Sequence, residues 1–558
     1  MIFSRVVVPL ALQLPIFAVA EDLTEHIWAV FAFNVYGDST PTVLPQARTL
    51  TSLGARSLYN VGAAFRDRYL LGLSNETILD TWIQGISQYR LVTEEVNIYS
   101  TTDQFIAASA LAFMQGLYPP LESANDTYLD DDYLLAHGVV VDSPLNDYQY
   151  PRIYTTGFTD SNSIAVAGHV DCPMYRISEL QYQSSPEFQQ VDAESTGFYA
   201  YLYDIALAGV FDKSTVGYAN AYNIFEYLQY EYTHNSTLQA LLSLSDLKRA
   251  KLLADQYVFA TNGNLSASGL HENDHIRAIA GRTLTRLILK SFEANIESQG
   301  STPKMTLVFG SFEPVVALAA LAQLASPKNR NFYGLPVLGA SLAFELYSLE
   351  DSASFSDQYP DVSNLLVRFL FRNSTYPSTG FTYYPLFGHG PSQIAIPFTE
   401  FESQMAQFLL PSTEAWCNTC NSSAIFCDGV VSEHTTSHKK ALSPASAGAI
   451  GACVTLATLA AIAGIAWLCG LRVHRRHKPD MGGFKGSDKM ASDHDLSFRR
   501  DGKNGTTIQG HERTGSWAMK QQKWGDSRGC TASNLDDDAD DILQVNPYAE
   551  PVKIHESV

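Results

Sequence analysis

The stretch "HENDH", residues 271–275, matches the H-E-x-x-H pattern of zinc peptidases. In that chemistry two histidines one helical turn apart bind a single zinc ion, and the glutamate acts as a general base. The polar residues before the stretch are typical of a loop, and Asn273 or Asp274 is suited to cap a helix that begins at Ile276. The two histidines would then lie on either side of a helix cap, and no third ligand is identifiable. We therefore predict that this stretch binds no metal.

Two further motifs have simpler interpretations. His389 lies between two glycines in "FGHGPS", but the sequence has no serine nucleophile elbow to pair with it, so we expect a loop histidine. Cys417 and Cys420 form one C-x-x-C pair, and a structural zinc site needs a second pair of ligands. With Cys172 and Cys427 they make an even number of cysteines before a predicted membrane span, which predicts two disulfides in one of three connectivities.

The stretch "WAVFAFNVYGDSTP", residues 28–41, predicts a buried strand over residues 29–33 that ends in a loop. Ligand sites in open α/β sheets lie at the carboxyl ends of strands. The one side chain here that could attack a substrate is Tyr36, and a phenol with a pKa of about 10 is a poor nucleophile without a neighbouring cation. We expect no cation near Tyr36, so the loop has a suitable shape but contains no residue that would bind an anion.

The segments that must position this loop follow a strand–helix pattern. Residues 48–70 have apolar side chains at helical spacing, with Thr49 or Thr51 able to cap the start; residues 96–100 predict a strand, and a second helix runs to Gly116. This order indicates a mostly parallel sheet. Long helical patterns over residues 118–291 predict an inserted helical cap, and further strands are expected at 305–314, 341–349 and 364–373.

Both ends of the chain carry targeting signals. Residues 1–20 combine a basic residue, an apolar run and a small-x-small end, which predicts a cleaved secretory signal peptide. Residues 447–471 lack charges and are long enough to span a bilayer, and a basic cluster follows directly. We predict a single-pass type I membrane protein in the plasma membrane or an endomembrane. Residues 21–415 would form the main extracellular or luminal domain, residues 416–446 a cysteine-containing segment and stalk, and residues 472–558 a disordered cytoplasmic tail.

Charge and glycosylation motifs agree with this topology. Residues 472–558 hold equal numbers of basic and acidic side chains, so the net charge of −21 belongs to the part before them. Such an acidic domain argues against nucleic-acid binding. Six asparagine acceptor motifs precede the predicted span, at Asn75, Asn125, Asn235, Asn264, Asn373 and Asn421. Their spread predicts a glycosylated surface.

Six segments in order along the chain carry a family resemblance: "WAVFAFNVYGDSTP", "LTSLGARSLYNVGAAFRDRY", "ASALAFMQGLYPP", "MTLVFGSFEPVVAL", "SLAFELYS" and "YPLFGHGPSQ". Together they resemble the histidine acid phosphatase branch of the histidine phosphatase superfamily, in particular its fungal secreted or membrane-bound members. The resemblance implies an α/β fold with a phosphoglycerate-mutase-like core and an inserted helical cap.

The family's chemistry depends on an R-H-G-x-R-x-P loop after the first strand, in which the histidine attacks phosphorus and the arginines hold the phosphate. A third arginine lies on a following helix, and a His-Asp or His-Ala-Glu pair completes the pocket. When these positions are carried onto the sequence, Gly37 and Pro41 are retained. The other family positions hold different residue types: Val35, Tyr36 (the nucleophile position), Ser39, Phe105 (the helix arginine), Phe312 and Glu313.

The resemblance therefore implies a retained frame without its reactive groups. Asp38 and Glu313 would repel a phosphate dianion, and phosphoryl transfer depends on positive charge around the phosphate. We predict a catalytically inactive domain, a pseudophosphatase, that binds a ligand or protein partner at its extracellular or luminal side and needs no cofactor or metal. The alternative is an acid phosphatase or phytase-like enzyme that uses Glu313 and an unusual nucleophile.

Overall fold

The computed structural model describes residues 23–73, 81–121, 135–137, 139, 141, 143–267, 274–351 and 358–428. The predicted signal peptide, membrane span, tail, Asn75 and Asn125 lie outside these residues. None of the helices in the described part is both long and apolar enough to cross a membrane. The chain divides into two units, Met1–Ala441 and Leu442–Val558, and all described residues belong to the first. That unit contains the sheet, its core and both disulfides, so we expect it to fold without the second.

One sheet of eight strands forms the centre, in the order β3-β2-β4-β1-β5-β6-β7, with β8 paired to β6. The strands are β1 (Leu23–Val35), β2 (Val96–Thr101), β3 (Ile153–Thr156), β4 (Met305–Gly310), β5 (Ser341–Asp351), β6 (Leu365–Arg372), β7 (Thr382–Tyr384) and β8 (Ala395–Pro397). Strands β1 to β4 pair in parallel, whereas β5 pairs antiparallel with both β1 and β6. The predicted strands are present, but the one expected at residues 305–314 ends at Gly310, because residues 313 and 314 begin a helix. The sheet is mixed, not mostly parallel.

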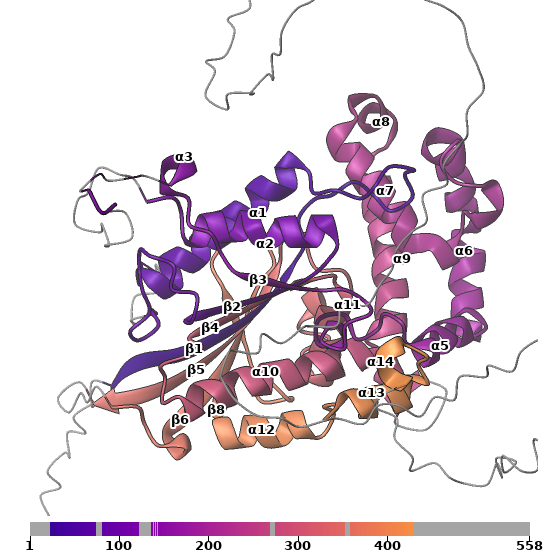
Figure 1. Cartoon of the computed structure of the whole chain (residues 1–558). Helices are drawn as coiled ribbons and strands as arrows, with labels where there is room; N and C mark the ends of the chain where they lie inside the picture. The colour runs from indigo at the N-terminus through magenta and orange to yellow at the C-terminus, as the bar shows by residue number, and fades with distance from the viewer. Residues whose placement is uncertain are drawn as a thin grey trace, which may run out of the picture. The chain divides into compact units, whose positions relative to one another are not determined.

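Helices cover both faces of this sheet (Figure 1). They are α1 (Ser52–Phe65), α2 (Gln104–Leu117), α3 (Pro144–Asp147), α4 (Ser163–Ala167), α5 (Pro173–Gln183), α6 (Pro186–Leu202), α7 (Ala221–His234), α8 (Ser236–Leu241), α9 (Leu244–Asn262), α10 (Ile279–Glu297), α11 (Glu313–Leu321), α12 (Phe398–Ala406), α13 (Thr413–Cys420) and α14 (Ile425–Asp428). Helices α1 and α2 lie on one face, and α10 and α12 lie on the other. The apolar strands are thereby buried on both sides.

The helix predicted at residues 48–70 begins at Ser52, four residues later than predicted. Thr51 caps α1, because its side chain accepts a hydrogen bond from the backbone N–H of Gly54. The stretch ends as a π-helical turn, Arg66–Leu70, in which Arg68 and Tyr69 are buried. Arg48 therefore belongs to the loop before the helix, where its side chain is available to the site described below.

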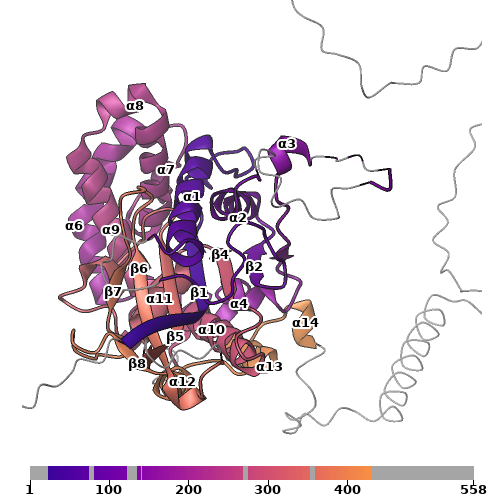
Figure 2. The same cartoon turned by 90° about the vertical axis from the view of Figure 1, so that its left-hand side faces the viewer.

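Helices α5 to α9 form the cap, and they have their own apolar core of aromatic side chains such as Tyr199 and Tyr218. Helices α6 to α9 lie together beside the end of the sheet in both views (Figures 1 and 2). Within the range 118–291, however, β3 joins the sheet edge beside β2, and α10 contacts β1. The sequence pattern did not indicate that these two segments belong to the core.

The remaining motifs have structural roles. The predicted disulfides are present as Cys172–Cys420 and Cys417–Cys427, so the C-x-x-C pair is divided between two bridges. His389 is a loop residue whose Nε2 lies 2.9 Å from a carboxylate oxygen of Glu400.

In "HENDH", the Asp274 carboxylate accepts a hydrogen bond from the backbone N–H of Ile276, but the predicted cap is wrong: His275 precedes a short 3₁₀ turn, Ile276–Ala278, and α10 begins only at Ile279. Residues 271–273 lie outside the described part. Within the described ranges no three His, Cys, Asp or Glu side chains are placed to hold a metal ion.

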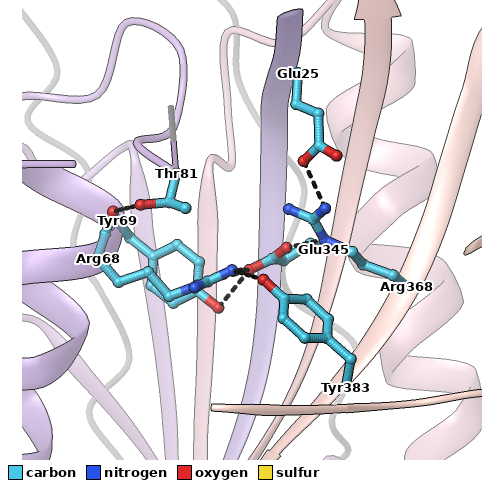
Figure 3. Close-up of polar contacts among 7 residues, drawn as sticks. All are labelled: Glu25, Arg68, Tyr69, Thr81, Glu345, Arg368 and Tyr383. Atoms are coloured by element: carbon cyan, nitrogen blue, oxygen red, sulfur yellow. Dashed lines mark hydrogen bonds and ion pairs between the residues drawn. The ribbon is translucent and has the colours of Figure 1, made fainter. Parts of the chain in front are cut away.

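A buried ionic cluster joins β5, β6 and the π-helical turn (Figure 3). Glu345 is fully buried between Arg68 and Arg368, and it accepts hydrogen bonds from Arg68 at 2.9 and 3.0 Å and from the Tyr69 hydroxyl at 2.8 Å. Arg368 also contacts Glu345 and Glu25. A buried carboxylate in such a position needs these partners, since an unpaired one is strongly destabilising.

Candidate functional site

A cavity of about 370 Å³ lies where β1 ends. Its floor consists of the residues that follow β1, together with Arg48 and Phe312. Helices α7 and α9 and the loop at residues 335–338 form its walls. Ligand pockets of small molecules typically have volumes of about 300–1,000 Å³. The cavity is thus at the carboxyl end of β1, where the sequence predicted a ligand site, and helices α7 and α9 of the cap line one side of it.

The loop after β1 is held closely against its neighbours. The backbone N–H of Tyr36 donates to the carbonyl of Gly310, at the end of the parallel strand β4, and the N–H of Gly37 donates to the Ser109 hydroxyl at 3.0 Å. A Cβ atom on Gly37 would lie 2.8 Å from the carbonyl oxygen of Gly54, which is closer than real contacts allow. Glycine is retained here because the start of α1 leaves no room for a side chain.

Arg48 reaches the cavity because residues 38–51 fold back on themselves. Ser39 forms a β-bridge with Leu50, and the N–H of Thr51 donates to the Asp38 carbonyl. This places the guanidinium of Arg48 2.9 Å from the Tyr36 hydroxyl and 3.2 Å from that of Ser39. We expected no cation near Tyr36, and that expectation is wrong. Arg48 was the first residue of the stretch predicted to be helical, residues 48–70, so the prediction placed it in the helix and not in the loop after β1.

The positive charge of Arg48 is neutralised by a carboxylate of the cap. Arg48 forms an ion pair with Glu226 of α7, and both side chains are largely buried. Glu226 also accepts hydrogen bonds from the Tyr222 hydroxyl at 3.0 Å and from the backbone N–H of Thr42 at 3.1 Å. Tyr222 and Glu226 are four residues apart and therefore lie on one face of α7. An internal carboxylate thus binds the guanidinium that could otherwise bind an anion.

The hydrogen bonds of this cluster form a closed ring. The hydroxyls of Tyr36 and Tyr222 are 3.1 Å apart, and either could donate by distance alone. Tyr222 donates its proton to Glu226, so Tyr36 must donate to Tyr222 while it accepts from Arg48. Arg48 and Glu226 make further hydrogen bonds to Ser39 and Thr42 outside the ring. The Tyr36 proton is therefore held in the ring and is not directed into the cavity.

The ionisation of Tyr36 is opposed by its surroundings. Burial raises the pKa of Tyr36 from 10.0 to about 12, although the charge of Arg48 acts in the opposite direction. Burial also raises the pKa of Tyr222 well above its usual value, with further contributions from Tyr36 and Glu226. A nucleophile must be substantially deprotonated to attack. At neutral or acidic pH the Tyr36 phenol is protonated and unreactive.

Four of the sequence-predicted positions meet at the cavity: Val35, Tyr36, Ser39 and Phe312. Phe105 packs edge-on against the Tyr36 ring at 4.8 Å, and Arg48 lies over the Phe105 ring at 4.1 Å. Arg48 therefore stacks on Phe105, the residue that the sequence predicted at the family's helix-arginine position. Gly37 and Pro41 belong to the loop that shapes the floor, and Pro41 is buried. Among the described residues that line the cavity there is no histidine and no cysteine.

Glu313 does not line the cavity. It is the first residue of α11, and one of its carboxylate oxygens lies 3.5 Å from Nε2 of His169. The other oxygen and Nδ1 of His169 are buried without a hydrogen-bond partner. The Glu313 carboxylate, predicted at the family's acid position, is thus directed toward His169, and it does not line the cavity.

The comparison with known families agrees with the resemblance. The sequence profile of the histidine phosphatase superfamily (branch 2) matches residues 31–372, which is more than half of the chain. The chain belongs to this superfamily. No curated protein sequence matches it.

Solved structures with a similar fold are enzymes of low sequence identity. The phytase from Citrobacter braakii has 12% identity and a TM-score of 0.46, and the alignment covers 70% of this chain and 99% of that chain. The phytase from Klebsiella sp ASR1 has 13% identity and a TM-score of 0.45, covering 70% and 97%. The phytase from D. castellii has 12% identity and a TM-score of 0.41, covering 74% and 86%. Similarity at this level carries no argument about the site.

Proposed function

We propose that this protein is a single-pass membrane glycoprotein whose histidine-phosphatase domain binds a ligand or partner outside the cytoplasm without hydrolysing phosphomonoesters. One observation carries the proposal: Arg48, the cation beside Tyr36, is already paired with Glu226. A phosphate group would have to displace this carboxylate. It would also meet the negative charge of Asp38 on the same cavity lining.

The missing nucleophile supports the same conclusion. A phosphohistidine mechanism needs an imidazole at the end of β1, and Tyr36 stands at that position with its proton held by Tyr222. Phosphoryl transfer depends mainly on positioning and on positive charge around the transferred group. The floor of the cavity offers Val35, Tyr36 and Ser39 in place of such charges.

The membrane and glycoprotein parts of the proposal rest on the sequence signals at both chain ends and on the asparagine motifs. Two disulfides are consistent with a domain that matures in an oxidising compartment. Asn235 and Asn421 are exposed, so their motifs are accessible to glycosylation. A mobility shift after glycosidase treatment, together with protection of the domain from protease in sealed microsomes, would test the topology.

Catalytic inactivity is tested with a secreted protein that ends at Ala441. We expect no turnover of p-nitrophenyl phosphate and no binding of vanadate or inorganic phosphate by calorimetry. Replacing Glu226→Gln releases Arg48, and a charge-assisted hydrogen bond is worth about 1.5–3 kcal/mol, so phosphate affinity should rise by roughly 10- to 150-fold. Glu231→Gln is a matched control on the same helix, because Glu231 bonds Asn235 and does not line the cavity.

A second variant tests the assigned family positions directly. The combined substitution Val35→Arg, Tyr36→His, Ser39→Arg and Phe312→His, with Glu226→Gln, should bind vanadate where the parent protein does not. The proposal is wrong if the parent protein hydrolyses p-nitrophenyl phosphate at the rate of an ordinary acid phosphatase and loses that activity on Tyr36→Phe. That result would establish the alternative, an enzyme with an unusual nucleophile.

A further inference from the structure

The cavity is lined by many apolar side chains besides the hydrogen-bonded ring of Arg48, Tyr36, Tyr222 and Glu226. We propose that it binds a small amphipathic molecule with one alkyl or aromatic body and a single anionic group, with the body inside the cavity and the anionic group at its rim beside Lys248. The inference rests on the proposed function, because a working phosphatase site would bind a phosphate ester on the same floor.

The walls provide the surface for the apolar body. On α7 and α9 the lining residues recur at intervals of three and four, so one face of each helix is directed at the cavity. The apolar members of the walls are Phe225, Leu244, Leu247, Leu335, Pro336, Val337 and Leu338. Leu244 and Val337 are 53% and 42% exposed, which leaves large apolar side chains in contact with water. A ligand with an apolar body would cover them.

The floor does not accept a charged group. Arg48, Tyr36, Tyr222 and Glu226 bind one another in the hydrogen-bonded ring described above. An anion placed there would have to break the ring or remain unpaired, and burial of an unpaired charge is costly. The apolar end of the ligand must therefore point toward the floor, against the aromatic faces of Tyr222 and Phe312, whose rings are 4.8 Å apart.

The rim provides one available positive charge. Nζ of Lys251 lies 2.8 Å from both carboxylate oxygens of Asp255, and Asp38 is paired with His234. Among the charged side chains that line the cavity in the described part of the chain, Lys248 alone has neither a hydrogen bond nor an ion pair. It is exposed and follows Leu247 on α9. A flexible ammonium group at this place can bind a carboxylate or sulfonate at the cavity mouth.

Calorimetric titration of the protein ending at Ala441 with decanoate, below its micelle concentration, tests the inference. We expect saturable binding at one site and weaker binding of decanol, which has the same alkyl chain without the charge. Inorganic phosphate should not compete. Leu247→Trp fills the cavity and should weaken decanoate binding by more than about 10-fold. Lys248→Glu should weaken it by about 3- to 10-fold, as for an exposed ion pair that becomes repulsive.

Lys328→Glu is the matched charge control, because Lys328 is exposed and does not line the cavity. The Lys328→Glu variant should bind decanoate with the same affinity as the parent protein. If Leu247→Trp lowers the melting temperature, Val337→Trp tests the same volume from the opposite wall. The inference is overturned if decanoate fails to bind, or if both tryptophan variants bind it normally. Absence of decanoate and phosphate binding together would refute only this inference, whereas phosphate binding with turnover would refute the proposed function as well.

Discussion

Replacing Glu345 by glutamine tests how the domain tolerates a carboxylate at the centre of its sheet. Glu345 has no exposed surface, and Arg68 and Arg368 both contact it. Glutamine keeps the shape but removes the negative charge, which leaves two buried guanidinium groups without full compensation. Breaking a buried ion pair in this way typically costs about 3–5 kcal/mol, so we expect a loss of that size in the free energy of unfolding near neutral pH.

The pH dependence of the free energy of unfolding gives a second, independent value for the contribution of the Glu345 carboxylate to stability. Burial by itself would raise the pKa of Glu345, but Arg368 and Arg68, with hydrogen bonds from Arg368 and Tyr69, lower it from 4.5 to about 2. Because the folded pKa lies below the unfolded one, the carboxylate contributes stability above about pH 4.5, and this contribution is lost as the pH falls toward 2. The difference between the two pKa values corresponds to about 3 kcal/mol.

The assay is urea unfolding of the protein ending at Ala441, followed by tryptophan fluorescence with the disulfides intact, at several pH values between about 2 and 7. The difference in free energy of unfolding between the parent protein and Glu345→Gln should decrease by about 3 kcal/mol across the acid range. Glu194→Gln, an exposed control on α6, should change stability by less than about 0.5 kcal/mol. This reasoning would be refuted if the free energies of unfolding of the parent protein and Glu345→Gln differed little near neutral pH, or if their difference did not change with pH.

Three further predictions concern the loop and the disulfides. Thr51→Ala should lower the free energy of unfolding by about 1–2 kcal/mol in chemical denaturation, because it removes the cap of α1 and a contact to Asp38, whereas Thr51→Ser should retain most of it. Gly54→Ala should lower the melting temperature in calorimetry, since its Cβ would lie 2.2 Å from the Asp38 carbonyl oxygen; an unchanged transition would contradict this packing. Removing the Cys172–Cys420 bridge, which joins residues 248 apart, should cost about 2–5 kcal/mol and more than removing Cys417–Cys427, which joins residues 10 apart; equal losses would argue against a chain-entropy origin.

Local patterns in the sequence were sufficient to predict most helices and strands of the core. The apolar run after Trp28 predicts β1, the spacing of Leu58, Val61 and Phe65 predicts α1, and the later runs predict β4, β5 and β6. The loop after β1 and the family resemblance were also readable without a structure, and the family is confirmed. These features are encoded within a few residues of one another, because periodicity and capping depend on near neighbours.

The content of the site was decided by contacts between distant parts of the chain. Arg48 and Glu226 are 178 residues apart, and no local pattern indicates that the cap would place a carboxylate on that guanidinium. The direction of Glu313 toward His169, the pairing of Cys172 with Cys420 and the ionic cluster around Glu345 are of the same kind. The sequence by itself determined the frame and the residue types after β1. Only the tertiary structure determined which charges meet, because side-chain pairing follows from how the cap packs on the sheet.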